Sequence, residues 1–188
     1  MKKYIVVLRM LLSVCLLIAP LSATNAGWNP FDDKTKDNST NDKGINKTIT
    51  SFKKKDADLK RFFADAYGYA VFPTVAKAGM GIGGAYGKGK VYRRGSYIGD
   101  TSLTQLTIGF QLGGQTYSEI IFFGTKAALN EFMRGEFEFN AQISAVAVTA
   151  GASADVDYNH GVAVFTVAKG GLMYEASVGG QKFTFSKK

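Results

Sequence analysis

The chain has 188 residues and a formal net charge of +8, with one cysteine and one histidine. A single cysteine excludes a disulfide within the chain and any metal or redox site built from several cysteines, so no cofactor is expected. The excess of Lys and Arg favours acidic partners.

The first 26 residues have the pattern of a secretory signal peptide. A basic start with Lys2, Lys3 and Arg9 precedes an apolar stretch, and small residues follow up to Ala26. This pattern predicts export, to the periplasm, the cell envelope or the outside, with cleavage after residue 26. Cleavage would remove three positive charges and no acid, which leaves +5.

Residues 27–50 are rich in Asp, Asn, Lys and Thr and poor in apolar side chains. Such a segment buries too little apolar surface to offset the entropy of ordering, which predicts a disordered polar linker. The remaining residues, 51–188, are numerous enough to form one domain with a real hydrophobic core.

This domain begins with a pattern typical of an amphipathic helix over residues 51–66. Its apolar positions fall on one stripe at 100° per residue: Phe52, Leu59, Phe62, Phe63 and Ala66. A basic flank lies on a different arc: Lys53, Lys54, Lys60 and Arg61. The helix either packs on a sheet with its charged side in water, or presents the basic flank to anionic lipid.

Glycine-rich β patterns follow at residues 69–75, 80–86 and 90–94. Gly79, Gly81 and Gly84 match the G-x-G-x-x-G spacing. We reject a dinucleotide site, because the sequence after these glycines continues as a strand and not as a helix. The run GYAVFPTVAK at 68–77 returns as GVAVFTVAK at 161–169, each followed by glycines, which predicts two similar hairpins.

Residues 105–112 alternate between polar and apolar side chains, which predicts a half-buried strand. Gly113-Gly114 is typical of a hairpin turn, with a return strand over 115–123. A short helix is predicted over 126–134, with Thr125 as N-cap and Gly135 after its end. These elements indicate an α+β fold: a strongly curved, mainly antiparallel and even barrel-like β-sheet, an N-terminal amphipathic helix and one short internal helix.

Patterns for catalysis are weak, and no enzyme activity is expected. His160 stands in a turn, and Asp155, Asp157 and Asn159 lack the glycine and glutamate positions of a calcium loop. Glu119 and Glu175 would form an acid/base pair only if their carboxylates lie within about 10 Å of each other on the same side of the sheet.

The positive charge is the better indication of function. The candidate lipid-binding residues are Lys53, Lys54, Lys60, Arg61, Arg93 and Arg94. Near an anionic lipid surface each such charge is worth about 1 kcal/mol, which predicts weak, reversible binding. Nucleic acid suits the same charge, but an exported protein rarely meets it, so no nucleic-acid partner is expected.

The chain from about residue 50 to 188 resembles a SYLF domain. The matching motifs are Phe62-Phe63 with Ala66, Gly68–Pro73 in the form GYAVFP, Lys77 with Gly79, Gly83-Gly84, QLGGQ at 111–115, Tyr117-Ser118-Glu119, and Gly170-Gly171-Leu172 with Glu175. Eukaryotic members bind phosphoinositides through a basic surface and an N-terminal amphipathic helix, and yeast members also bind and bundle actin. The resemblance implies a module for anionic membrane lipids; the alternative is a protein-interaction module for a filament or an envelope protein.

Overall fold

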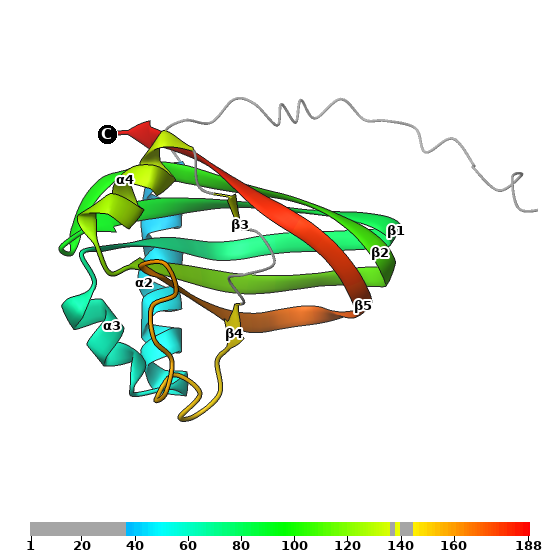
Figure 1. Ribbon diagram of the computed structural model, residues 1–188, viewed down its shortest axis with the longest axis horizontal. Helices are drawn as coiled ribbons and strands as arrows, with labels where there is room; N and C mark the ends of the chain where they lie inside the picture. Colours follow the sequence, from blue (N-terminus) through cyan, green and yellow to red (C-terminus); the bar gives the residue numbers. More distant parts are fainter. Residues whose placement is uncertain (1–36, 136–137, 140–144) are drawn as a thin grey trace, which may run out of the picture. The chain divides into compact units, whose positions relative to one another are not determined.

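A computed structural model describes residues 37–135, 138–139 and 145–188 (Figure 1). Three long antiparallel strands dominate it: β1 (Gly68–Arg93), β2 (Ser96–Phe123) and β5 (Val162–Lys187). Two short strands complete the sheet, β3 (Glu138–Phe139) antiparallel to β5 and β4 (Val146–Ala147) parallel to it. The α+β class and the mainly antiparallel sheet are confirmed.

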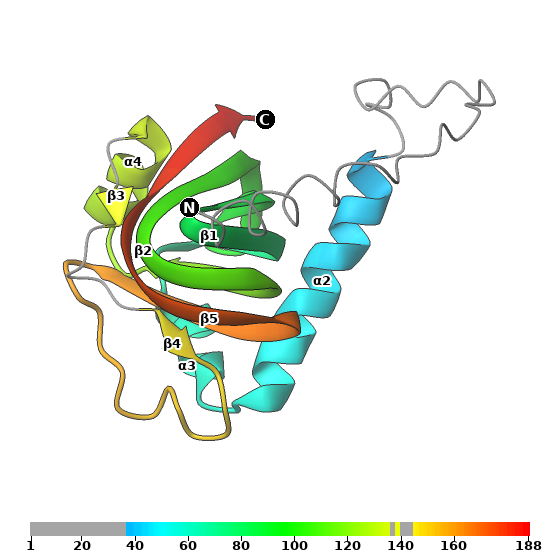
Figure 2. The same ribbon diagram turned by 90° about the vertical axis from the view of Figure 1, so that its right-hand side faces the viewer.

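The three long strands curve strongly along their length (Figure 2). The pairing order β1-β2-β5-β3 describes an open sheet, so barrel-like closure stays a prediction. The predicted turn at Gly113-Gly114 is wrong, because β2 continues through both glycines, which pair with Gly79 and Ala78 of β1. The tight turn lies instead at Arg94-Gly95, where both residues have positive φ, 47° and 79°.

The two glycine-rich hairpins predicted from the sequence repeat are also single bent strands. Between Met80 and Ile82 the register of β1 against β2 shifts, and three residues of β2 face Gly81 alone. The side chain of Gln111 fills this bulge, where its amide donates to the carbonyls of Gly81 and Thr107. Glycine therefore bends the strands without reversing them, as bulges do.

Two apolar cores lie on opposite faces of the sheet. Successive side chains of β2 point to opposite faces. Ile121 and Phe123 lie in the core beneath helix α4 (Lys126–Arg134). Ile120 and Phe122 lie in the core beneath helices α2 and α3. Helix α4 begins at Thr125, whose hydroxyl accepts from the backbone N–H of Ala128, and ends at Gly135, as predicted.

The predicted helix over 51–66 is two helices, α2 (Asp37–Lys55) and α3 (Leu59–Asp65). The helix is interrupted at Asp56. Its buried carboxylate accepts hydrogen bonds from the backbone N–H groups of Asp58 and Ser153. The predicted apolar stripe is confirmed, since Phe52, Leu59, Phe62 and Ala66 are buried. No helix in the described part of the chain is both long and apolar enough to cross a membrane.

Helix α2 also corrects the predicted linker, because residues 37–50 are helical. Few apolar side chains suffice here: Ile45 is buried against the sheet with Phe52, two turns later. The helix is also fixed by charge, since Lys90 of β1, itself buried, pairs with Asp42 at 2.5 Å. Residues 27–36 and the predicted signal peptide lie outside the described residues.

Candidate functional site

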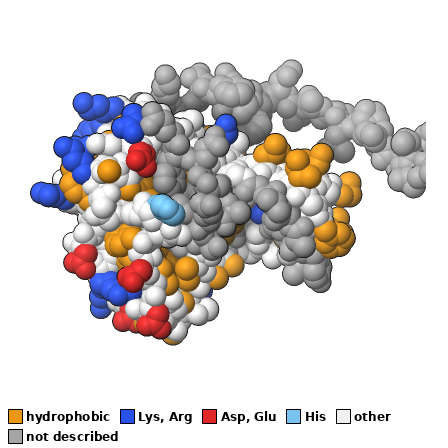
Figure 3. All heavy atoms as spheres, viewed as in Figure 1, with side chains coloured by type: hydrophobic (Ala, Val, Ile, Leu, Met, Phe, Trp, Pro, Cys, Tyr) orange, Lys and Arg blue, Asp and Glu red, His pale blue; other side chains and the backbone are white. Residues whose placement is uncertain are grey.

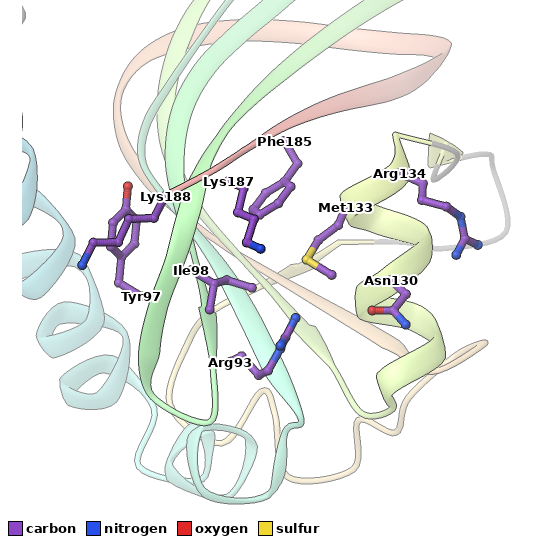
Figure 4. Close-up of a pocket in the computed structure, with 9 residues that line it drawn as sticks. All are labelled: Arg93, Tyr97, Ile98, Asn130, Met133, Arg134, Phe185, Lys187 and Lys188. Atoms are coloured by element: carbon purple, nitrogen blue, oxygen red, sulfur yellow. The ribbon is translucent and has the colours of Figure 1, made fainter.

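An open cavity of about 540 Å³ lies where the turn after β1, helix α4 and the end of β5 meet (Figure 4). We call it the basic pocket. It is lined by Arg93, Tyr97, Ile98, Asn130, Met133, Arg134, Phe185, Lys187 and Lys188. Four of these side chains are cations and none is an acid, so the pocket favours a negatively charged ligand.

Local structure explains why these residues meet. Asn130, Met133 and Arg134 are three and four residues apart on α4, so they share one face of that helix. The adjoining face carries Leu129 and Phe132, which are fully buried in the core against which Met133 also packs. The end of β5 is held beside the start of β2, because the backbone N–H of Lys188 donates to the carbonyl of Ile98 at 3.1 Å.

The floor of the pocket is apolar. Ile98, Met133 and Phe185 are partly buried and pack against the core beneath α4. Figure 4 shows them in the space between the sheet and α4, with Arg93 approaching from the β1 side. Cations around an apolar floor suit an amphiphile, whose anionic group meets the cations while its apolar part covers the floor.

Only one of the six predicted lipid-binding residues, Arg93, lines this pocket. Lys54 and Lys60 are exposed on α2 and α3, and the Lys53 ammonium lies 4.4 Å from the Phe63 ring. The Arg61 guanidinium donates to the carbonyls of Ser153 and Val156, which ties α3 to the loop before β5. The Arg61 guanidinium therefore stabilises the fold more than it serves as a binding group for a ligand.

Arg94 follows Arg93 in the turn and lies 5.4 Å from the Tyr67 ring. Sequence reasoning missed the other three cations of the pocket, Arg134, Lys187 and Lys188. They are separated from Arg93 by forty residues of chain or more. The pairing of β2 with β5 brings Lys187 and Lys188 beside it, and Arg134 comes from α4. The sequence signal for two of them was the Lys187-Lys188 pair.

A second surface feature lies where the long strands bend, near the middle of β1 and β2. Its side chains are large, apolar and between 53% and 80% exposed: Met80, Ile82, Leu106, Ile108, Phe110 and Leu112. We call this set the apolar patch. Met80 pairs with Leu112 and Ile82 with Ile108 across β1 and β2, so the patch is continuous over two strands.

Figure 3 shows hydrophobic side chains gathered at one end of the molecule, over the bend of the sheet, and Lys and Arg side chains gathered at the other end. The apolar patch and the basic pocket are therefore separate surfaces. An exposed apolar surface of this kind is typical of a contact site for a membrane or a protein.

The described residues include no group of three or more His, Cys, Asp and Glu side chains able to hold a metal ion. Glu119 pairs with Thr166 across the sheet, whereas Glu175 pairs with Gln111, eight residues away along β2. Eight residues of strand measure about 26 Å along the chain, so the two glutamates stand on different stretches of the bent sheet. The side chain of Glu175 lies outside the described residues.

Comparison with known proteins agrees with the sequence motifs. Residues 104–188 match the family model described as Ysc84, Las17-binding protein actin regulator. The chain is 28% identical over 140 residues to "Beta cell expansion factor A" of Aeromonas veronii, an alignment that covers 68% of this chain and 49% of that protein. The chain thus spans about half the length of this curated relative. These matches confirm the resemblance drawn from the motifs: residues 104–188, slightly less than half of the chain, are similar to the Ysc84, or SYLF, family.

Proposed function

We propose that this protein is a non-enzymatic binding module that attaches to membranes rich in anionic lipid headgroups. The basic pocket is the observation that carries the proposal, because it combines four cations with an apolar floor and has no acid in its lining. The signal-like residues 1–26 support a place of action after export, at the cell envelope or outside the cell.

The charges set the expected strength of this attachment. At about 1 kcal/mol for each cation near an anionic surface, the four in the pocket would supply roughly 4 kcal/mol, which corresponds to millimolar binding. Contact of lipid with Ile98, Met133 and Phe185 would add a hydrophobic contribution on top of this. Reversible binding whose electrostatic part weakens with salt follows from the charges.

The helices contribute less than the sequence alone suggested. Phe52, Leu59 and Phe62 are fully or almost fully buried, so the apolar stripe is not free to enter a bilayer. In this proposal Lys53, Lys54, Lys60, Arg61 and Arg94 act only as a basic flank that strengthens long-range attraction. Their contribution should therefore vanish first when salt is added.

Reversing two charges of the pocket is the direct test. The double substitution Arg93→Glu/Lys187→Glu should weaken sedimentation with phosphatidylglycerol vesicles at least about tenfold, since each reversal replaces an attraction by a repulsion. Neither side chain is buried, so the melting temperature should change little. Wild-type protein should leave phosphatidylcholine vesicles largely unbound.

The control has the same change in net charge at exposed lysines outside the pocket, Lys43→Glu/Lys126→Glu. It should lose much less binding than the pocket variant. A helix variant, Lys54→Glu/Lys60→Glu, measures how much the basic flank contributes to vesicle binding. Equal binding to both kinds of vesicle, or equal losses in pocket and control variants, would contradict the proposal.

The apolar patch favours a second candidate function, that of a protein-interaction module for a filament or an envelope protein. The family description names a regulator of actin that binds another protein, which makes such a partner reasonable. Ile108→Ser/Phe110→Ser should then abolish co-sedimentation with that partner in lipid-free buffer, while vesicle binding persists. Attachment to neutral vesicles that survives high salt and is lost in this variant would instead assign the patch to membranes.

A further inference from the structure

A second cavity, of about 360 Å³, lies on the face of the sheet that carries the core beneath α4, and it is lined by both polar and apolar side chains. Glu119 continues along β2 from Ile121, a core residue of that face, and therefore points the same way. Around Glu119 stand Lys77, Gln105, Gln115, Tyr117, Thr166 and Gln181. This polar cavity shares no residue with the basic pocket, so it is a separate site.

The Glu119 carboxyl group is the unusual feature of the polar cavity. The residue is 1% exposed, and its Oε2 accepts a long hydrogen bond of 3.4 Å from the Gln181 amide. Its Oε1 is buried without a hydrogen-bond partner. Buried acceptors are nearly always satisfied, so an orphaned carboxyl oxygen in the wall of a cavity indicates a donor that comes from a ligand.

The other walls define the chemical class of that ligand. Gln105, Gln115 and Gln181 each carry an amide that both donates and accepts, and Thr166 adds a hydroxyl. Lys77, almost fully buried, is the one cation among the described residues that line the cavity and Glu119 the one acid, so the formal charges of the lining sum to zero. An anionic ligand would meet Glu119 and a cationic ligand would meet Lys77, which favours a neutral molecule with several groups that donate and accept.

We propose that the polar cavity binds a small neutral polyhydroxylated molecule of the sugar class, with one ligand hydroxyl donating to Glu119 Oε1. The volume lies within the range of small-molecule sites, which is about 300–1,000 Å³. Hydroxyl groups match amide-lined walls because each hydroxyl both donates and accepts. This binding is independent of membrane attachment.

The test compares sugars that share the glucose ring and carry different charges. Titration calorimetry of the full chain without residues 1–26 should detect glucose and N-acetylglucosamine more strongly than glucosamine, a cation, or glucuronate, an anion. Thr166→Val keeps the β-branched shape and removes the hydroxyl, and should weaken glucose binding about two- to tenfold, the worth of one hydrogen bond. Glu119→Met, which removes the acceptor at similar volume, should weaken it at least as much.

Thr184→Val is the matched control, because it makes the same change on the same strand where the hydroxyl meets Ser102 outside the cavity. Its glucose affinity should equal that of the wild type. The proposal is overturned if no neutral sugar binds at millimolar concentration, if a charged probe binds best, or if Thr184→Val weakens binding as much as Thr166→Val. Should Glu119→Met fail to fold, the threonine pair alone decides between these outcomes.

Discussion

Replacing Phe122 by alanine should lower the free energy of unfolding by about 4 kcal/mol, within the range of 3–5 kcal/mol for large aromatic side chains in cores. Phe122 is fully buried in the core beneath α2 and α3. Its ring lies 4.8 Å from that of Phe63 and 5.4 Å from that of Phe62, both on α3, and 5.9 Å from that of Phe165 on β5. Its loss would leave a cavity between helix and sheet.

Chemical unfolding in urea measures this effect, and the matched control lies on the same strand. Phe110→Ala removes the same ring from a residue that is 72% exposed, so its cost should stay within about 0.5 kcal/mol, as for ordinary surface substitutions. A cost for Phe122→Ala as small as about 0.5 kcal/mol would show that Phe122 does not anchor α3. A cost for Phe110→Ala as large as about 4 kcal/mol would show that the apolar patch is covered in solution.

The contrast between these two phenylalanines shows what periodicity can and cannot predict. Alternation over residues 105–112 correctly predicted a strand, but its apolar side is the exposed one, and Thr107 and Gln111 are buried instead. Periodicity separates two faces without saying which of them a helix will cover. Here α2 and α3 cover the sheet around Val71, Ile120 and Phe122, which leaves the apolar patch bare at the bend of the strands.

Glycine-rich segments were the main source of error in the predicted fold. Gly113-Gly114 suits a two-residue turn, but it suits a bend in a continuous strand equally well, and the pairing partners on both sides decide between them. Gly113 pairs with both Gly79 and Met173, which keeps β2 extended across the sheet. Local sequence contains no information on such distant partners.

The residues of the candidate site were also hard to predict, because most of them are distant from one another in the sequence. Arg93 could be chosen from the sequence because it belongs to a dense basic stretch. Its companions in the basic pocket could not, since they come from α4 and from the end of the chain. Helix α4 itself was predicted correctly from its caps, which are local features, whereas the pocket depends on the long-range pairing of β2 with β5.

Replacing Glu119 by glutamine should remove a marked pH dependence of stability. Burial raises the pKa of Glu119 from 4.5 to about 7, against a smaller opposing effect of the hydrogen bond from Gln181. The folded state thus holds its proton more tightly than the unfolded state, so stability falls as pH rises from about 4.5 to about 7 and then levels off. The total loss is on the order of 3 kcal/mol, at 1.36 kcal/mol for each pKa unit.

Glutamine has the shape of glutamate and does not titrate, so this contribution should be absent in Glu119→Gln. In urea unfolding across that pH window, the free energy of unfolding of the variant should rise relative to that of the wild type as pH rises. The difference should be largest above about pH 7. Glu131→Gln, at an exposed position of α4, is the matched control and should follow the wild type. Parallel pH profiles for wild type and Glu119→Gln would mean that the carboxylate stays charged and satisfied in the folded state. An unpartnered Oε1 in the polar cavity would then be untenable, and with it the inference that a ligand hydroxyl supplies the missing donor.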